Sequence, residues 1–218
     1  MADLRVHRIV GSPYAGRVAL AAAHKHLTVA WVDVDPDDRR AVRRLSGQDR
    51  VPVAEAPDGG PPLVGSMAIL RALDDHWPTR PLWPTDPGDA ALADLFARRF
   101  DDVWHGPAQR LAELLAPVGH DRDALPDRWR RAVDDDAARL QRWNDRLEER
   151  LLDADHLGGP TFGICDVVAH PFLRHGALGP DGAPGALPIV LHRHGTIDRA
   201  AHPRLHAWVR RVEDLHAA

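Results

Sequence analysis

A change in apolar pattern near residue 78 constrains the fold of this chain more than any other feature. Before it, β-rich runs alternate with helix-forming runs, as where "LRVHRIV" is followed by "AGRVALAAAHKH". From about residue 89, apolar residues recur at helical spacing almost throughout. The stretch between them, "PTRPLWPTDPGD", is rich in proline and typical of a linker. The sequence therefore predicts two domains, residues 1–78 and 89–218, joined by a linker over residues 79–88.

The first domain is predicted to have the element order β-α-β-α-β-β-α. Strands are expected over residues 4–10 and 27–35, and helices over residues 15–26 and 36–47. Two short strands should flank the turn "PDGG", and a helix should follow from "SMAILRALDDHW". This order predicts an α/β domain followed by an all-α domain.

Three apolar stripes are predicted for the helical domain. The first runs through Leu92, Phe96, Arg99 and Val103. A longer one runs from Trp129 to Leu151, and the last contains Leu205, Trp208, Val209, Val212 and Leu215. Each stripe should face the core of the domain.

Charge and composition exclude several classes of protein. The net charge of −4, with acidic and basic residues interspersed, argues against nucleic acid as a partner. Cys165 is the only cysteine, so the chain has no internal disulfide or dithiol pair. No apolar run approaches the roughly 18 residues of a membrane helix, and "MADLRVHRIV" is too short and charged for a signal peptide. We expect a cytoplasmic protein without a membrane segment.

The motif "GSPYAGRV" places a serine hydroxyl where the first strand gives way to the first helix. Two interpretations are open from these residues alone. Ser12 can act chemically, or it can cap the helix or fill a turn beside Pro13, as serine commonly does.

Six motifs in their order resemble the soluble glutathione transferase family, in its serine- or cysteine-type, bacterial-like form. They are "SPYAGRV", "RVPV", "SMAILRALDDHWP", "PLWPTDP", "TFGICDVVAHPFL" and "HPRLHAWVRRVE". The resemblance implies a thioredoxin-like first domain that binds glutathione and an all-helical second domain that forms the second-substrate site. It also implies a homodimer.

The resemblance implies that Ser12 stabilises the thiolate of glutathione, with Tyr14 as the second candidate. A free thiol has a pKa of ~8.5, and lowering it by about two units needs roughly 2.7 kcal/mol. A hydroxyl that donates to an anion contributes about 1.5–3 kcal/mol, and a helix N-terminus adds about 0.3–1 kcal/mol. Together these two effects suffice, and Ser12 need not remove the proton.

Two further motifs are implied to hold the tripeptide. In "RVPV", the resemblance implies a cis peptide bond before Pro52 and a backbone contact from Val51, with Arg50 alongside. In "VGSM", Ser66 is implied to hold the γ-glutamyl group at a helix N-terminus. Gly65 stands where the family has an acidic residue or Gln, so the ligand's ammonium loses its expected acceptor. This departure puts glutathione itself in question.

The second substrate is implied to be a hydrophobic, electrophilic small molecule. Besides Tyr14, its candidate contacts are Arg99, Asp101, Trp104 and His105 in "FARRFDDVWHGPAQR", for which a solvated helix face with Trp104 packed is the alternative. In "TFGICDVV", Gly163 replaces the usual capping Ser or Thr, and Asp166 is expected to have a structural role.

A metal site is the weaker of two interpretations of the histidines in "LHRHG". On a strand, His192 and His194 would point to one side and bind a metal with His202 or Asp198. We predict no metal and regard these as surface histidines. The segment 176–195 is expected to be a long connection to the last helix, and two roles are open for it: shaping the second-substrate site or forming a dimer surface.

Three functions follow from the resemblance. The first is a transferase in which the glutathione thiolate attacks an electrophilic carbon. The second is a glutathione-dependent cis-trans isomerase that uses the same site. The third, suggested by Gly65, is a transferase-like binding protein without catalysis.

Overall fold

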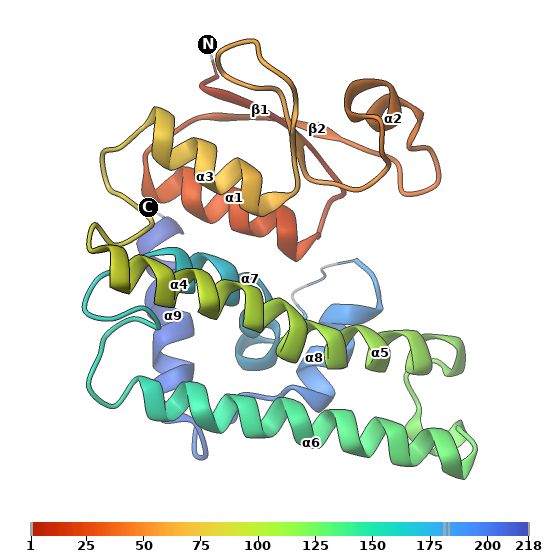
Figure 1. The fold of residues 1–218 in the computed structure, drawn as a ribbon. Coiled ribbons are helices and arrows are strands. Elements are labelled where there is room, and N and C mark those ends of the chain that lie inside the picture. Colours follow the sequence, from red (N-terminus) through yellow and green to blue (C-terminus); the bar gives the residue numbers. More distant parts are fainter. Residues whose placement is uncertain (1, 181, 183, 218) are drawn as a thin grey trace. The chain divides into compact units, whose positions relative to one another are not determined.

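Backbone contacts divide the chain after Trp83 into two units, which are described separately. The structure is a computed structural model and describes residues 2–180, 182 and 184–217 (Figure 1). One unit runs to Trp83 and the other begins at Pro84, so the predicted linker spans the division.

The N-terminal unit contains a four-stranded mixed sheet. Its strands are β1 (Leu4–Arg8), β2 (Val29–Asp33), β3 (Val53–Ala54) and β4 (Leu63–Val64), in the order β2-β1-β3-β4. β1 pairs in parallel with β2, whereas β1 with β3 and β3 with β4 are antiparallel. With the helices α1 (Pro13–His24), α2 (Arg40–Ser46) and α3 (Ser66–His76), the chain follows β-α-β-α-β-β-α, which confirms the predicted thioredoxin-like order.

Alternation along the strands gives the sheet two buried faces. Val53 and Val34 pack with Val42 of α2 on one face. Val6 and Ala54, which are paired and fully buried, point to the other face. That face is covered by α1 and α3, which contact each other and lie side by side against the sheet in Figure 1.

Lys25, the single lysine of the chain, joins the end of α1 to α3 in this unit. The Lys25 side chain is fully buried at the end of α1, and its Nζ lies 2.7 Å from Asp74 Oδ1 on α3. The Asp74 carboxylate also accepts the backbone N–H groups of Leu82 and Trp83 at 2.9–3.0 Å. A buried ion pair therefore fixes the chain that leaves α3.

The second unit is helical in the described residues. Its elements are α4 (Pro87–Phe100), the π-helical turn η1 (Asp101–His105), α5 (Gly106–Leu115), the 3-10 turns η2 (Ala116–Val118) and η3 (Arg122–Ala124), α6 (Asp127–Arg150), α7 (Ile164–Leu178), α8 (Ala186–His194) and α9 (Pro203–Ala217). None of the helices in the described part of the chain has the length and apolar character needed to span a membrane.

Aromatic side chains from α4, η1 and α7 form the centre of the helical core. The rings of Phe100 and Trp104 stack with their centroids 5.4 Å apart, and Phe172 meets both edge-on. The last predicted stripe is buried from Leu205 to Val212, but Leu215 is exposed.

The first predicted stripe was wrong in phase. On α4 and η1 the buried residues are Ala93, Ala97, Phe100 and Trp104, whereas Leu92 is 62% exposed. Small alanines allow neighbouring helices to approach closely, so the buried face follows them rather than the leucines.

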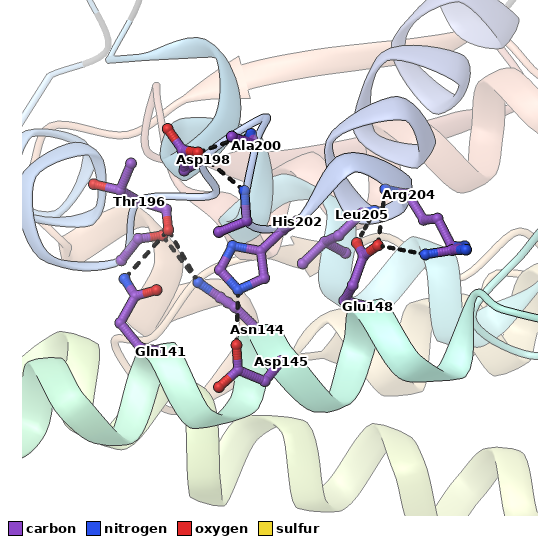
Figure 2. Close-up of polar contacts among 12 residues, drawn as sticks. Gln141, Asn144, Asp145, Glu148, Thr196, Asp198, Ala200, His202, Arg204 and Leu205 are labelled. Atoms are coloured by element: carbon purple, nitrogen blue, oxygen red, sulfur yellow. Dashed lines mark hydrogen bonds and ion pairs between the residues drawn. The ribbon is translucent and has the colours of Figure 1, made fainter.

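One face of α6 holds the segment between α8 and α9 through polar bonds (Figure 2). Gln141 and Asn144 donate to backbone carbonyls over residues 194–196. Asp145 Oδ1 lies 3.0 Å from Nε2 of the buried His202. Glu148 accepts the backbone N–H groups of Arg204 and Leu205 at 3.1 and 2.7 Å, and thereby caps the start of α9.

The segment 176–195 is not the long connection that the sequence suggested. Residues 176–178 complete α7 and residues 186–194 form α8, while Asp181 and Ala183 lie outside the described residues. Gly176 is needed here because an added Cβ would lie 2.4 Å from the backbone oxygen of Gly195.

Candidate functional site

Three loops of the N-terminal unit meet at one edge of the sheet. His7 on β1 pairs with Val53 on β3, so Val51 and Pro52 lie beside the chain that leaves β1 toward Ser12. Val53 also pairs with Val64 on β4, and the N–H of Gly65 donates to the Pro52 carbonyl at 2.9 Å. The register therefore brings the starts of α1 and α3 to the same edge as the Val51–Pro52 loop.

Ser12 is the N-cap residue of α1, with φ −67° and ψ 122°. Its backbone N–H donates to the Ile9 carbonyl, and its own carbonyl accepts from the N–H of Gly16. Its hydroxyl makes no capping bond and no hydrogen bond to any residue that the structure describes. Serine at this position normally caps the helix. Here the hydroxyl makes no capping bond and is therefore available to a ligand.

Tyr14 and Arg17 lie one turn apart at the start of α1. The guanidinium carbon of Arg17 lies 4.8 Å from the centroid of the Tyr14 ring, and Arg17 is completely buried. This stacking holds the half-buried tyrosine ring in place. Neither the sequence motif nor the spacing had singled out Arg17.

The peptide bond between Val51 and Pro52 is cis, as the resemblance implied. Next to it, Gly65 precedes α3 with φ +87° and ψ 153°, a backbone conformation that favours glycine. Ser66, the first residue of α3, is only 5% exposed, and its hydroxyl makes no hydrogen bond within the described residues.

The loop before Val51 is organised by residues that sequence reasoning missed. Gln48 accepts the backbone N–H of Arg50 at 2.6 Å and donates to the Ser46 hydroxyl at 2.7 Å. Arg39, the residue before α2, donates to the Asp49 carbonyl, and Arg43 of α2 pairs with the Asp49 carboxylate at 2.9 Å. The hydrogen bond from Arg43 lowers the pKa of Asp49. Polar residues two apart in "SGQDR" are the signal that points to such a turn.

The other second-substrate candidates lie in the helical unit. Asp101, Trp104 and His105 belong to the π-helical turn η1, and the exposed Arg99 is on the last turn of α4. Trp104 is 1% exposed, and its Nε1 lies 3.4 Å from Asn144 Oδ1. This burial favours the packing alternative for Trp104, whereas Asp101 and His105 are partly exposed.

Asp166 is a buried hub at the start of α7. Its carboxylate accepts the backbone N–H groups of Leu157 and Gly163 and the indole N–H of Trp208, at 2.7–3.0 Å. The bond from Gly163 is the half of a capping box that a glycine can make. These contacts agree with the expected structural role of Asp166.

Cys165 is buried beside this hub. Burial, with a smaller contribution from the neighbouring Asp166 charge, raises the pKa of its thiol to about 12. The thiol is therefore protonated at neutral pH and is a poor nucleophile.

The proposed histidine arrangement does not form. His192 and His194 lie on helix α8 rather than on a strand, so side chains two residues apart do not face the same way. The described residues contain no group of three or more His, Cys, Asp or Glu side chains suited to holding a metal ion.

Comparisons with known proteins cover both units. Residues 6–81 match the family model for the "Glutathione S-transferase, N-terminal domain". A probable glutathione S-transferase, GSTU6, of Oryza sativa subsp. japonica is 28% identical over 221 residues, which cover 99% of this chain and 86% of that relative. Glutathione S-transferase U7 of Arabidopsis thaliana is 23% identical over 72% of this chain, and the chain spans 63% of that relative's length.

A solved structure shares the fold. It is a glutathione S-transferase from Methylobacterium radiotolerans in complex with glutathione sulfonate, with a TM-score of 0.64 and 27% sequence identity. The match covers 96% of this chain and 90% of that one.

Proposed function

We propose that this chain, which belongs to the glutathione S-transferase family, is a glutathione transferase-like enzyme in which Ser12 stabilises the glutathione thiolate for attack on an electrophilic small molecule. The observation that carries this proposal is the hydroxyl of Ser12, which stands at the N-terminus of α1 and makes no capping bond. Such a hydroxyl can donate to a sulfur anion that the helix N-terminus also favours.

The rest of the glutathione site follows the same edge of the sheet. The backbone of Val51, next to the cis Pro52, is proposed to pair with the cysteinyl part of the tripeptide, with Arg50 alongside. Ser66 and the first turn of α3 are proposed to bind the γ-glutamyl carboxylate. The relative crystallised with glutathione sulfonate supports a ligand of this size and charge.

The chemical step is an attack by sulfur. The thiol proton leaves to solvent, the thiolate forms a bond to the electrophilic carbon, and the leaving group departs with the electron pair of its bond. Ser12 donates its hydrogen bond to the sulfur and keeps its own proton, because an unaided serine is a poor base.

We further propose that Arg99, Asp101 and His105 contact the hydrophobic second substrate. These residues lie at or next to the π-helical turn η1, and such turns are frequent at functional sites. Trp104 contributes by packing beneath this turn against Phe172.

We also propose that the protein forms a homodimer and is located in the cytoplasm. The α4 side chains Leu92 and Leu95 are 62% and 45% exposed, which gives this helix an apolar surface that a second copy would cover. A reducing compartment suits an enzyme whose substrate is a free thiol.

Thermal unfolding with increasing glutathione tests the proposal first. A ligand at a hundredfold excess over its Kd should stabilise the protein by ~2.7 kcal/mol, or about 5–10 °C in Tm. No shift with millimolar glutathione would contradict the proposal and favour a different thiol or a non-catalytic protein.

Product identification then separates the two reactions of the same site. Conjugation consumes glutathione in proportion to product, whereas cis-trans isomerisation returns it unchanged. Stoichiometric loss of glutathione with a model electrophile is the expected result, and turnover without loss would identify the isomerase.

A further inference from the structure

We propose that Gly65 makes the thiol site selective for the carboxylate of the γ-glutamyl end and indifferent to the ammonium group beside it. This inference rests on the proposed function, because it concerns the thiol ligand of that site. It means that an otherwise identical thiol without this amino group should bind as well as glutathione.

The start of α3 has features that favour binding of an anion. Ser66 is 5% exposed, and its hydroxyl makes no hydrogen bond to any described residue, so the hydroxyl is available to a ligand. The first turn of α3 contains no acidic residue, and no side chain caps it. Its free backbone N–H groups and the positive end of the helix dipole favour a carboxylate at this position.

The same features offer no attraction to a cation. The dipole at the N-terminus of a helix does not stabilise a positive charge, so an ammonium group is held there only if an acceptor is present. Gly65 has no side chain with which to supply one. The nearest carboxylate along α3 is that of Asp74, which is eight residues after Ser66 and therefore roughly 12 Å along the helix at a rise of about 1.5 Å per residue. Asp74 is also already paired with Lys25 and with two backbone N–H groups.

Steric exclusion does not explain the missing side chain at residue 65. A Cβ built on Gly65 meets nothing within 4 Å. Its φ of +87° strains any other residue by a similar amount, because the strain arises in the backbone. Alanine at this position therefore controls for strain, while glutamate adds both the strain and an acceptor.

The test compares two thiols in three proteins by isothermal titration calorimetry. The thiols are glutathione and glutaryl-cysteinylglycine, which is glutathione with hydrogen in place of the α-ammonium group. The proteins are the wild type, Gly65→Ala and Gly65→Glu. The wild type and Gly65→Ala should bind the two thiols with Kd values within about threefold of each other. Gly65→Glu should favour glutathione by about tenfold or more, the effect of one charge-assisted hydrogen bond.

Each other outcome overturns the inference in a recognisable way. A wild-type preference for glutathione of tenfold or more would show that another group holds the ammonium, and this ratio decides the question even if Gly65→Glu does not fold. Equal binding that stays equal in folded Gly65→Glu would show that residue 65 does not determine specificity. Binding of neither thiol to the wild type would refute the proposed function together with the inference.

Discussion

The starts of the helices differ between the two units in what their polar side chains bond. In the helical unit, Asp166 accepts the N–H of Gly163 before α7, and Glu148 accepts two N–H groups at the start of α9. In the N-terminal unit, Ser12 is the N-cap residue of α1 and its hydroxyl makes no capping bond, while Gly65, the N-cap residue of α3, has no side chain to cap with. At these helix starts, polar side chains cap backbone N–H groups in the helical unit, whereas the Ser12 hydroxyl in the N-terminal unit does not.

The absence of a side-chain cap is not by itself evidence that a helix start binds a ligand. The starts of α6 and α8 also have no side-chain cap, but the flanking residues there are Pro126 and Gly185, which have no polar side chain to offer. Ser12 has a group well suited to capping, since serine is among the preferred N-cap residues. That its hydroxyl caps nothing points to a role in binding rather than in folding.

The largest effect is expected where the helical unit uses a buried carboxylate. Asp166→Ala should lower the free energy of unfolding by about 3–5 kcal/mol, because three N–H donors, two of them buried, lose their acceptor. Urea denaturation measures this loss. Asp135→Ala, at an exposed position on the same unit, is the control and should change little. A loss below about 1 kcal/mol for Asp166→Ala would break the contrast between the units.

Ser12→Ala should show the opposite pattern. Activity with a model electrophile should fall about ten- to hundredfold, corresponding to about 1.5–3 kcal/mol of lost hydrogen bonding to the thiolate. The free energy of unfolding should stay within about 0.5 kcal/mol, because no capping bond is removed. Ser12→Thr keeps the hydroxyl and should retain most of the activity. If Ser12→Ala loses stability but keeps its activity, Ser12 is a helix cap and does not stabilise the thiolate.

Glu148→Ala sharpens the comparison at the start of α9. Two backbone N–H groups lose their cap, so the free energy of unfolding should fall by about 1–2 kcal/mol. Hydrogen exchange should locate the loss at Arg204 and Leu205. The neighbouring Glu149 is exposed, and Glu149→Ala is the matched control with no expected change. Equal effects of the two substitutions would mean that Glu148 acts only as a surface charge.

Much of the N-terminal unit could be predicted because its motifs are local. Its strands and helices follow the period of the apolar residues, and the turn at Gly11 and the linker are marked by glycine and proline. The identity of Ser12 as a helix-start residue also follows from its place after the first strand. Whether its hydroxyl caps the helix depends on a side-chain rotation that no sequence pattern encodes.

The helical unit was harder to predict because its packing is non-local. The buried face of α4 follows Ala93 and Ala97, whose small size becomes an advantage only once a partner helix is in place. Helix α8 was missed since "LPIVLHRH" combines a proline with β-branched residues. Pro188 falls in the first turn of the helix, where the missing N–H costs nothing.

The pKa of the glutathione thiol in the bound state tests the central claim most directly. Ultraviolet absorbance of the thiolate, titrated with pH in the wild type and in Ser12→Ala, gives this value. The wild type should hold the pKa about two units below the ~8.5 of a free thiol, and Ser12→Ala should raise it by about one to two units. The same pKa in both proteins would contradict the claim that the uncapped hydroxyl at the start of α1 stabilises the thiolate.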